Sequence, residues 1–126
     1  MRYRLWYTTV YVRDFPRAVD FYADTLGMSL IRREDDFGYA AFDTGIAQFS
    51  LARVDDSMNN VDELTGRHTG LGLAVDDLAA AHKELAAKGV EFPMPPTRQP
   101  WGGTIALFAD PEGNISFLDE YREGAR

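Results

Sequence analysis

The feature that most constrains the fold is an internal repeat. The runs VYVRDFPRAVDFYADTLG and LAVDDLAAAHKELAAKG align so that Val12 meets Val75 and Asp14 meets Asp77. The offset is 63 residues, half of the 126-residue chain. A repeat of this length indicates the duplication of a supersecondary unit that cannot bury its own sheet alone.

Each copy of the repeat carries the start and stop signals of one helix. In the first copy Asp14 is placed to cap the helix, Pro16 lies in its first turn, and Gly27 ends it. In the second copy Asp77 is the cap and Gly89 is the stop. The sequence therefore predicts one helix in each half.

Strand-like runs surround both helices, so each half is predicted to be β-α-β-β-β. The expected strands are residues 6–12, 28–33, 39–42 and 47–54 in the first half, and 71–75, 90–92, 104–108 and 115–118 in the second. We predict a single α+β domain, 1–126, made of two modules, 1–54 and 68–126, joined by a polar linker, 55–67.

Composition limits the classes of binding partner and the cellular compartment that we expect. The net charge of -7, without a basic block, disfavours nucleic acid and anionic membranes as partners. No run is long enough for a transmembrane helix, and Thr8 and Thr9 interrupt the short apolar run near the N-terminus, so that run is better explained as a strand than as a signal peptide. The absence of cysteine is compatible with a reducing compartment, and we expect the protein to be cytoplasmic.

Two βαβββ units with a V-x-D helix entry in each, followed by the D-P-x-G-N turn at residues 110–114, resemble the vicinal oxygen chelate superfamily. This superfamily includes glyoxalase I, extradiol dioxygenases, fosfomycin-resistance enzymes and bleomycin-resistance proteins. The resemblance covers essentially the whole chain. It implies a half-open mixed β-barrel with helices outside, a ligand cavity within the concave sheet, and a homodimer. Whether the modules pair within one chain or across the dimer stays open.

The resemblance also implies four positions that hold metal ligands in the metal-dependent members. Here these positions carry Tyr7, either Gln48 or Ser50, Gly70, and Ser116. Divalent ions in such proteins need imidazole and carboxylate ligands, and neutral tyrosine, serine and glycine are poor substitutes. We therefore expect no metal and no other cofactor.

The two histidines of the chain are poor candidates to replace the missing metal ligands. His82 lies on the second predicted helix, where packing or solvent exposure is the simpler explanation. His68 lies two residues before Gly70 and would share its strand face if the strand extends that far. A substitute metal site built from His68, Gln48 and a neighbouring acid is the alternative.

Side chains alternate along a strand, and the faces expected to line the cavity differ between the two modules. The face of the first module is aromatic and hydroxylated, whereas the matching face of the second is nearly bare; the residues are Tyr7, Thr9 and Tyr11 in the first, and Gly70, Gly72 and Ala74 in the second. Either a flat organic ligand lies against the tyrosines, or the tyrosines fill the barrel and the glycines accommodate them.

The segment 93–103 (PMPPTRQPWGG) is predicted to be a loop with a binding role. Trp101 is placed to cap a cavity and Arg98 to meet an anionic group, although a packing tryptophan and a solvated arginine are the simpler explanations. Phe37 and Tyr39 are weaker candidates of the same kind.

The leading hypothesis is a metal-independent protein that binds a small molecule, sequestering an antibiotic or an aromatic metabolite. The alternatives are a glyoxalase- or dioxygenase-like enzyme with an atypical metal site or metal-free acid/base chemistry, for example by Tyr7 with His68, and an accessory domain with a filled cavity. Whether a reaction is catalysed stays open. The predicted ligand-binding residues are Tyr7, Thr9, Tyr11, Gln48, Ser50, His68, Arg98, Trp101 and Ser116.

Overall fold

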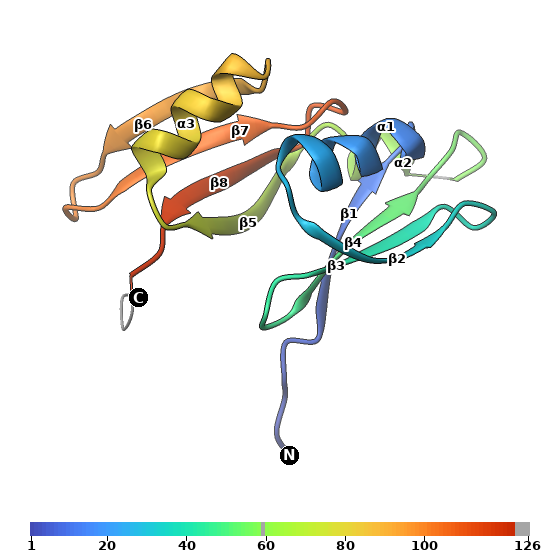
Figure 1. Cartoon of the computed structure of the whole chain (residues 1–126). Helices are drawn as coiled ribbons and strands as arrows, with labels where there is room; N and C mark the ends of the chain where they lie inside the picture. Colours follow the sequence, from blue (N-terminus) through green and yellow to red (C-terminus); the bar gives the residue numbers. More distant parts are fainter. Residues whose placement is uncertain (59, 123–126) are drawn as a thin grey trace. The chain divides into compact units, whose positions relative to one another are not determined.

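The computed structural model describes residues 1–58 and 60–122, and Figure 1 traces the chain. The chain divides into two compact units, Met1–Gly66 and Arg67–Arg126. Each unit contains one copy of the repeat.

The first unit is a four-stranded mixed sheet of order β1-β4-β3-β2, in which β1 and β4 are parallel and the other pairs are antiparallel. Its elements are β1 (Tyr7–Val12), α1 (Phe15–Asp20), the π-helical turn η1 (Phe21–Thr25), β2 (Ser29–Glu34), β3 (Tyr39–Asp43), β4 (Gln48–Arg53) and α2 (Val61–Leu64).

The second unit repeats this plan with the order β5-β8-β7-β6, again with one parallel pair, β5 and β8. Its elements are β5 (His68–Val75), α3 (Leu78–Ala87), β6 (Glu91–Arg98), β7 (Thr104–Ala109) and β8 (Ile115–Glu120). The predicted α+β class and the βαβββ order are thus confirmed in both units. Neither sheet closes into a barrel by itself. Among the described helices, none has the length and apolarity to cross a membrane.

The predicted helix starts and stops are confirmed. The Asp14 side chain accepts the N–H of Arg17 at 3.3 Å, and the Asp77 side chain accepts the N–H of Ala80 at 3.0 Å. Gly27 and Gly89 follow the helices with φ of 77° and 89°, in the left-handed region that glycine adopts without strain.

The core of the first unit lies between its helix and one face of its sheet. Val10 and Val12 of β1 are buried on this face. Phe49 of β4 packs against Tyr22 of η1, with ring centroids 4.8 Å apart, and against Phe42 of β3 at 5.7 Å. Because side chains alternate along a strand, the intervening residues of β1 and β4 point to the opposite face, which we call the open face.

In the second unit, α3 covers one face of the sheet (Figure 1). Phe108 and Leu118 are buried residues of this sheet. Leu78 and Leu85 are the buried residues of α3. Glu120, which shares this face with Leu118, accepts the N–H of Leu78 at 3.0 Å and so fixes the start of the helix on the sheet.

One predicted loop is a strand. The segment from Pro93 was expected to be irregular, yet β6 continues to Arg98 and pairs with β7 at Met94↔Leu107 and Arg98↔Thr104. β6 is the edge of the sheet, and its register shifts twice along this pairing. Edge strands and bulges are the places in a sheet that tolerate proline, because the missing N–H need not serve a ladder.

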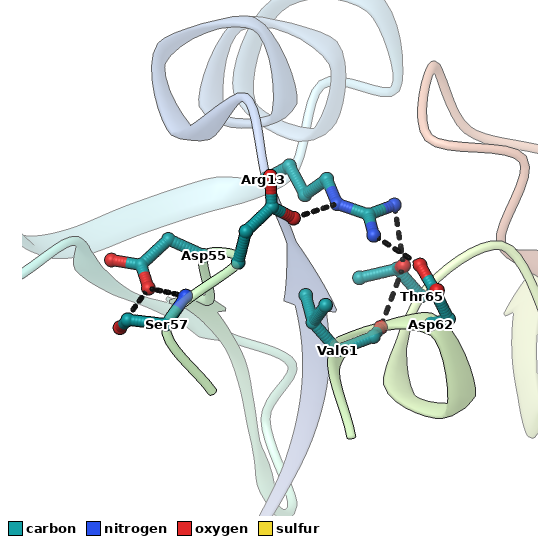
Figure 2. A network of polar contacts seen from close by, with 7 residues as sticks. Arg13, Asp55, Ser57, Val61, Asp62 and Thr65 are labelled. Carbon is teal, nitrogen blue, oxygen red and sulfur yellow. Dashed lines mark hydrogen bonds and ion pairs between the residues drawn. The ribbon is translucent and has the colours of Figure 1, made fainter. Parts of the chain in front are cut away.

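The predicted linker is partly structured, since α2 lies within it, and all of it but Arg67 falls in the first unit. Arg13, just after β1, donates to Thr65 Oγ1 at 3.1 Å and pairs with Asp62 at 2.5 Å (Figure 2). Near the start of the linker, the N–H and hydroxyl of Ser57 both donate to Asp55 Oδ1. The hydroxyl bond, followed by the N–H bond, lowers the pKa of Asp55 from its ordinary value.

Candidate functional site

A pocket with a volume of about 780 Å³ lies on the second sheet, and all of its lining residues come from the second unit. Register places Gly72 beside Phe117, and Ala74 beside Asp119. Since these residues alternate with Leu118 and Glu120, which face α3, they belong to the open face of this sheet.

Small residues make the floor of the pocket and aromatic residues border it. Gly70 has a φ of 77°, and a Cβ added there would meet nothing within 4 Å. The backbone at Gly70 departs from regular pairing, because the register of β5 and β8 shifts between His68 and Gly72. The aromatic lining comes from Trp101, Phe117 and Tyr121.

Ser116 does not lie on the open face, so its predicted place in the cavity is wrong. It pairs with Phe108, on the face that α3 covers, and it is 3% exposed. Its hydroxyl lies 2.6 Å from Thr69 Oγ1. The residue of this strand that reaches the open face is the next one, Phe117, because a shift of one residue moves a side chain to the other face.

His68 lies beside the pocket and contacts Phe117. The two rings have centroids 4.8 Å apart, and His68 Nδ1 accepts the N–H of Gly70 at 3.1 Å. The predicted strand does extend this far, so His68 opens β5. The other histidine, His82, packs edge-on against Phe92 at 4.6 Å, in keeping with a structural role.

Trp101 lines the pocket, whereas Arg98 is not among the lining residues, and a binding role for Trp101 stays a prediction. The turn that carries Trp101 is held by the bonds Gln99 N–H to Gly103 O at 2.7 Å and Gly102 N–H to Gln99 O at 2.9 Å. A Cβ on Gly103 would approach the indole Nε1 to 2.8 Å, so the missing side chain gives the indole its place. Sequence reasoning did not identify Gly103 or Phe117.

The open face of the first unit has a different character. The parallel register places Tyr7 beside Gln48 and Thr9 beside Ser50, so both Gln48 and Ser50 share the face of the β1 residues. Tyr11 lies farther along the same face, beside Ala52. The choice between Gln48 and Ser50 is thereby resolved, since residues two apart on a strand point the same way.

Ser50 is fully buried on this face. Its hydroxyl lies 3.1 Å from the hydroxyl of Tyr39, which comes from the neighbouring strand β3. On β2, Arg32 donates to Glu34 Oε1 at 2.8 Å, and this bond raises the pKa of Arg32 above its ordinary value. The first open face thus makes polar bonds among its own side chains.

The side chains at the four metal positions do not fit a divalent ion. The positions that the resemblance implies carry Tyr7, Gln48 or Ser50, Gly70 and Ser116, and the residue next to Ser116 that reaches the open face is Phe117. Glycine and phenylalanine offer no side-chain donor atom, and none of the others is a carboxylate or an imidazole. Within residues 1–58 and 60–122, no three His, Cys, Asp or Glu side chains are grouped so as to hold a metal.

Residues 4–115 match the family model of the Glyoxalase/Bleomycin resistance protein/Dioxygenase superfamily. The chain belongs to this superfamily. It is 31% identical over 112 residues to the uncharacterized protein YraH of Bacillus subtilis, covering 82% of this chain and 88% of that protein. It is also 31% identical over 133 residues to a lactoylglutathione lyase of Escherichia coli O157:H7, covering 98% and 96% of the two chains.

Solved structures of superfamily members share the fold. A member from Sphaerobacter thermophilus superposes with a TM-score of 0.79 at 29% identity, over 96% of this chain and 98% of that one. TnmS3, an antibiotic-binding protein from Streptomyces, superposes with a TM-score of 0.73 at 30% identity, over 97% and 98%. The chain is therefore similar both to a lyase and to an antibiotic-binding protein.

Proposed function

We propose that this superfamily member binds a small organic molecule on the open face of its second sheet and sequesters it without a metal ion. The observation that carries the proposal is the pocket itself, which is lined by Gly70 and Phe117 among others; by the resemblance, Gly70 stands at a position that holds a metal ligand in metal-dependent members. An open, aromatic-lined concavity of this size is typical of a small-molecule site. The similarity to the antibiotic-binding protein TnmS3 supports the same function.

Two measurements test the proposal on the full chain. Metal analysis of protein purified without chelator, followed by titration with Ni(II), Zn(II) and Mn(II), is expected to give no stoichiometric tight binding. A thermal-shift screen of antibiotics and planar aromatic metabolites is expected to give ligands that raise Tm. A ligand at 100 times its Kd stabilises the folded state by about 2.7 kcal/mol. Tight stoichiometric metal binding, or the absence of any stabilising ligand, would contradict the proposal.

The second candidate function is an enzyme of the lactoylglutathione lyase type. The observation that favours it is the 31% identity to the lyase from Escherichia coli O157:H7 over nearly the whole of both chains. The test is turnover of the hemithioacetal of methylglyoxal and glutathione, with and without added Ni(II) or Zn(II). Turnover that Tyr7→Phe or His68→Ala abolishes would establish the enzyme. A chain that binds ligands without turnover favours sequestration.

The expected assembly is a homodimer, which light scattering of the purified chain at two concentrations checks. Its outcome leaves the pocket proposal unaffected, because every lining residue belongs to one unit of one chain.

A further inference from the structure

We propose that the pocket binds small peptide-like molecules, whose amide groups pair with the main chain of β5 as an added strand; this inference rests on the proposed function and adds the chemical class of the ligand. β5 lies at an edge of the second sheet. Among the described strands it pairs only with β8, so its other edge has no neighbouring strand in this sheet. None of the eight residues of β5 is buried, and its main chain is therefore accessible.

The direction of the main-chain groups of β5 follows from its last residue. Val75 O accepts the N–H of Tyr121 at 2.7 Å, so the Val75 carbonyl points to the β8 side. The N–H and C=O groups of consecutive strand residues point to opposite edges, and the register is regular from Gly72 to Val75. The main-chain groups of Gly72 and Ala74 therefore point to the open edge, where each residue offers one donor and one acceptor.

The pocket extends over this edge. Its lining includes Gly72, Ala74 and also Leu73. The Leu73 side chain alternates with its two neighbours and points to the opposite face, so the place of Leu73 in the lining indicates that the pocket reaches the main chain. A Cβ added at Gly72 would meet the Phe117 Cβ at 3.9 Å and nothing nearer. A glycine inside a strand is typical of a place where a ligand or another backbone approaches closely.

The two edges of the second sheet are protected differently. Exposed edges attract further strands, and charged residues and prolines on the edge prevent this. β6 follows this rule, with three prolines together with Glu91 and Arg98. β5 contains no lysine, arginine, aspartate, glutamate or proline. The edge that borders the pocket is thus the one that can accept an added strand.

An added strand also presents side chains to the pocket. Every second side chain of such a strand lies on the open face, where Ile105 and Phe117 offer apolar contacts. An aromatic side chain suits this surface. Strand addition of this kind gains affinity from main-chain bonds and selectivity from alternate side chains.

Three peptides test the pairing on the full chain: acetyl-Thr-Tyr-Thr-Tyr-Thr-amide and two N-methylated isomers, one methylated at its first and third residues and one at its second and fourth. Kd is measured by isothermal titration calorimetry. Only one set of alternate N–H groups faces β5 in an added strand, so one isomer is expected to bind about ten-fold more weakly than the parent peptide and the other about equally. Equal affinities of all three peptides, or an equal loss in both isomers, overturns the inference.

Ala74→Pro removes an outward N–H from the protein and leaves the groups that bond β8 in place, as proline on an edge strand allows. It is expected to weaken binding of the parent peptide about ten-fold. Ala74→Val is the matched control, because it adds a similar volume and keeps the N–H, and it is expected to retain most of the affinity. A proline variant with full affinity overturns the inference, and the N-methylated isomers decide it on the wild-type chain whatever the proline does to folding.

A second copy of the chain is the competing occupant of this edge. Light scattering is expected to give the same assembly with and without the parent peptide, and dissociation of an assembly by the peptide would show that a second copy occupies the edge and would overturn the inference. If the peptides do not bind while the thermal-shift screen gives a ligand, the inference fails and the proposed function stands. If neither the peptides nor the screen gives a ligand, both fail.

Discussion

The two modules have the same backbone plan, but the side chains on their open faces differ in size and polarity. Tyr7 and Tyr11 of β1 correspond in the repeat to Gly70 and Ala74 of β5. The first face is covered by its own aromatic and hydroxyl groups, and Ser50 is completely buried there. The second face is bare and holds the pocket. The comparison teaches that the same backbone plan leaves room on the second face because the side chains at a few repeat-related positions are smaller there.

The largest expected effect on ligand affinity comes from placing a large side chain of the first open face at the corresponding position of the second. Ala74→Tyr places the side chain of Tyr11 at the corresponding position of β5, on the floor of the pocket. We expect ligand affinity to fall about 100-fold, or about 2.7 kcal/mol, because the ring occupies the space of the ligand. Titration with the best ligand of the screen measures the loss.

The control for this change is Ala79→Tyr, which adds the same ring to an exposed position of α3. It is expected to leave ligand affinity unchanged. Full binding by Ala74→Tyr would show that the ligand does not use the bare floor.

The next effect is on stability and concerns the first face alone. Tyr39→Phe removes the hydroxyl partner of Ser50 and leaves a buried polar group without that bond, which costs about 1–3 kcal/mol. Ser50→Ala should cost less, because the half-buried tyrosine can turn its hydroxyl toward water. Urea unfolding gives both values.

Tyr3→Phe, at a side chain that is 89% exposed, provides the baseline for these unfolding curves. Ligand affinity is expected to be the same in all three variants. A large loss of affinity in Tyr39→Phe would mean that the first face also takes part in binding.

A smaller effect is expected at the turn of the pocket. Gly103→Ala places a methyl group 2.8 Å from the indole Nε1 of Trp101, and the exposed indole must move. We expect a few-fold loss of ligand affinity, together with a changed Trp101 emission in a Trp6→Phe background, where Trp101 is the remaining tryptophan.

A double-mutant cycle identifies the cause of this loss. In a Trp101→Ala background, Gly103→Ala is expected to have no further effect on affinity, since the displaced group is absent. An undiminished loss in that background would show that Gly103 acts through the backbone of the turn instead.

The smallest expected effect is on stability and concerns Asp55, in the linker that follows the first module. The hydrogen bonds from Ser57 lower the folded-state pKa of Asp55, so the ionised form contributes stability above the ordinary carboxyl pKa. This contribution is lost as pH falls through the lowered folded value. Wild type should therefore exceed Asp55→Asn slightly in urea stability near neutral pH, and the difference should vanish in strong acid. A constant difference between the two across this range would rule out the linkage.

The fold could be predicted from the sequence because the repeat, the caps and the glycine stops agree. Asp14 and Asp77 begin helices and Gly27 and Gly89 follow them, as local backbone chemistry requires. The strand at residues 90–92 was predicted, but its continuation to Arg98 was missed because prolines usually mark loops, and only the order of the strands reveals that β6 is an edge.

The site was harder to predict. Side chains alternate between the two faces of a strand, so an error of one residue places a side chain on the wrong face of the sheet. The cavity position was assigned to Ser116, which the register places on the helix side, whereas its neighbour Phe117 reaches the open face. The sequence did indicate the bare second wall, although not that it would be the pocket. Tyr39 and Gly103 act through contacts with residues on other strands or across a turn, and no local pattern reports such contacts.

The most direct test of the central claim is a crystal structure of the full chain grown with Ni(II) and, as the probe, the tightest-binding aromatic ligand of the thermal-shift screen, recorded at the nickel absorption edge. The account predicts the probe lying over Gly72 with its rings near Trp101 and Phe117, and no anomalous peak within bonding distance of Tyr7, Ser50 or the main chain at Gly70. A nickel ion coordinated at those positions, with the pocket of the second sheet free of the probe, would contradict it.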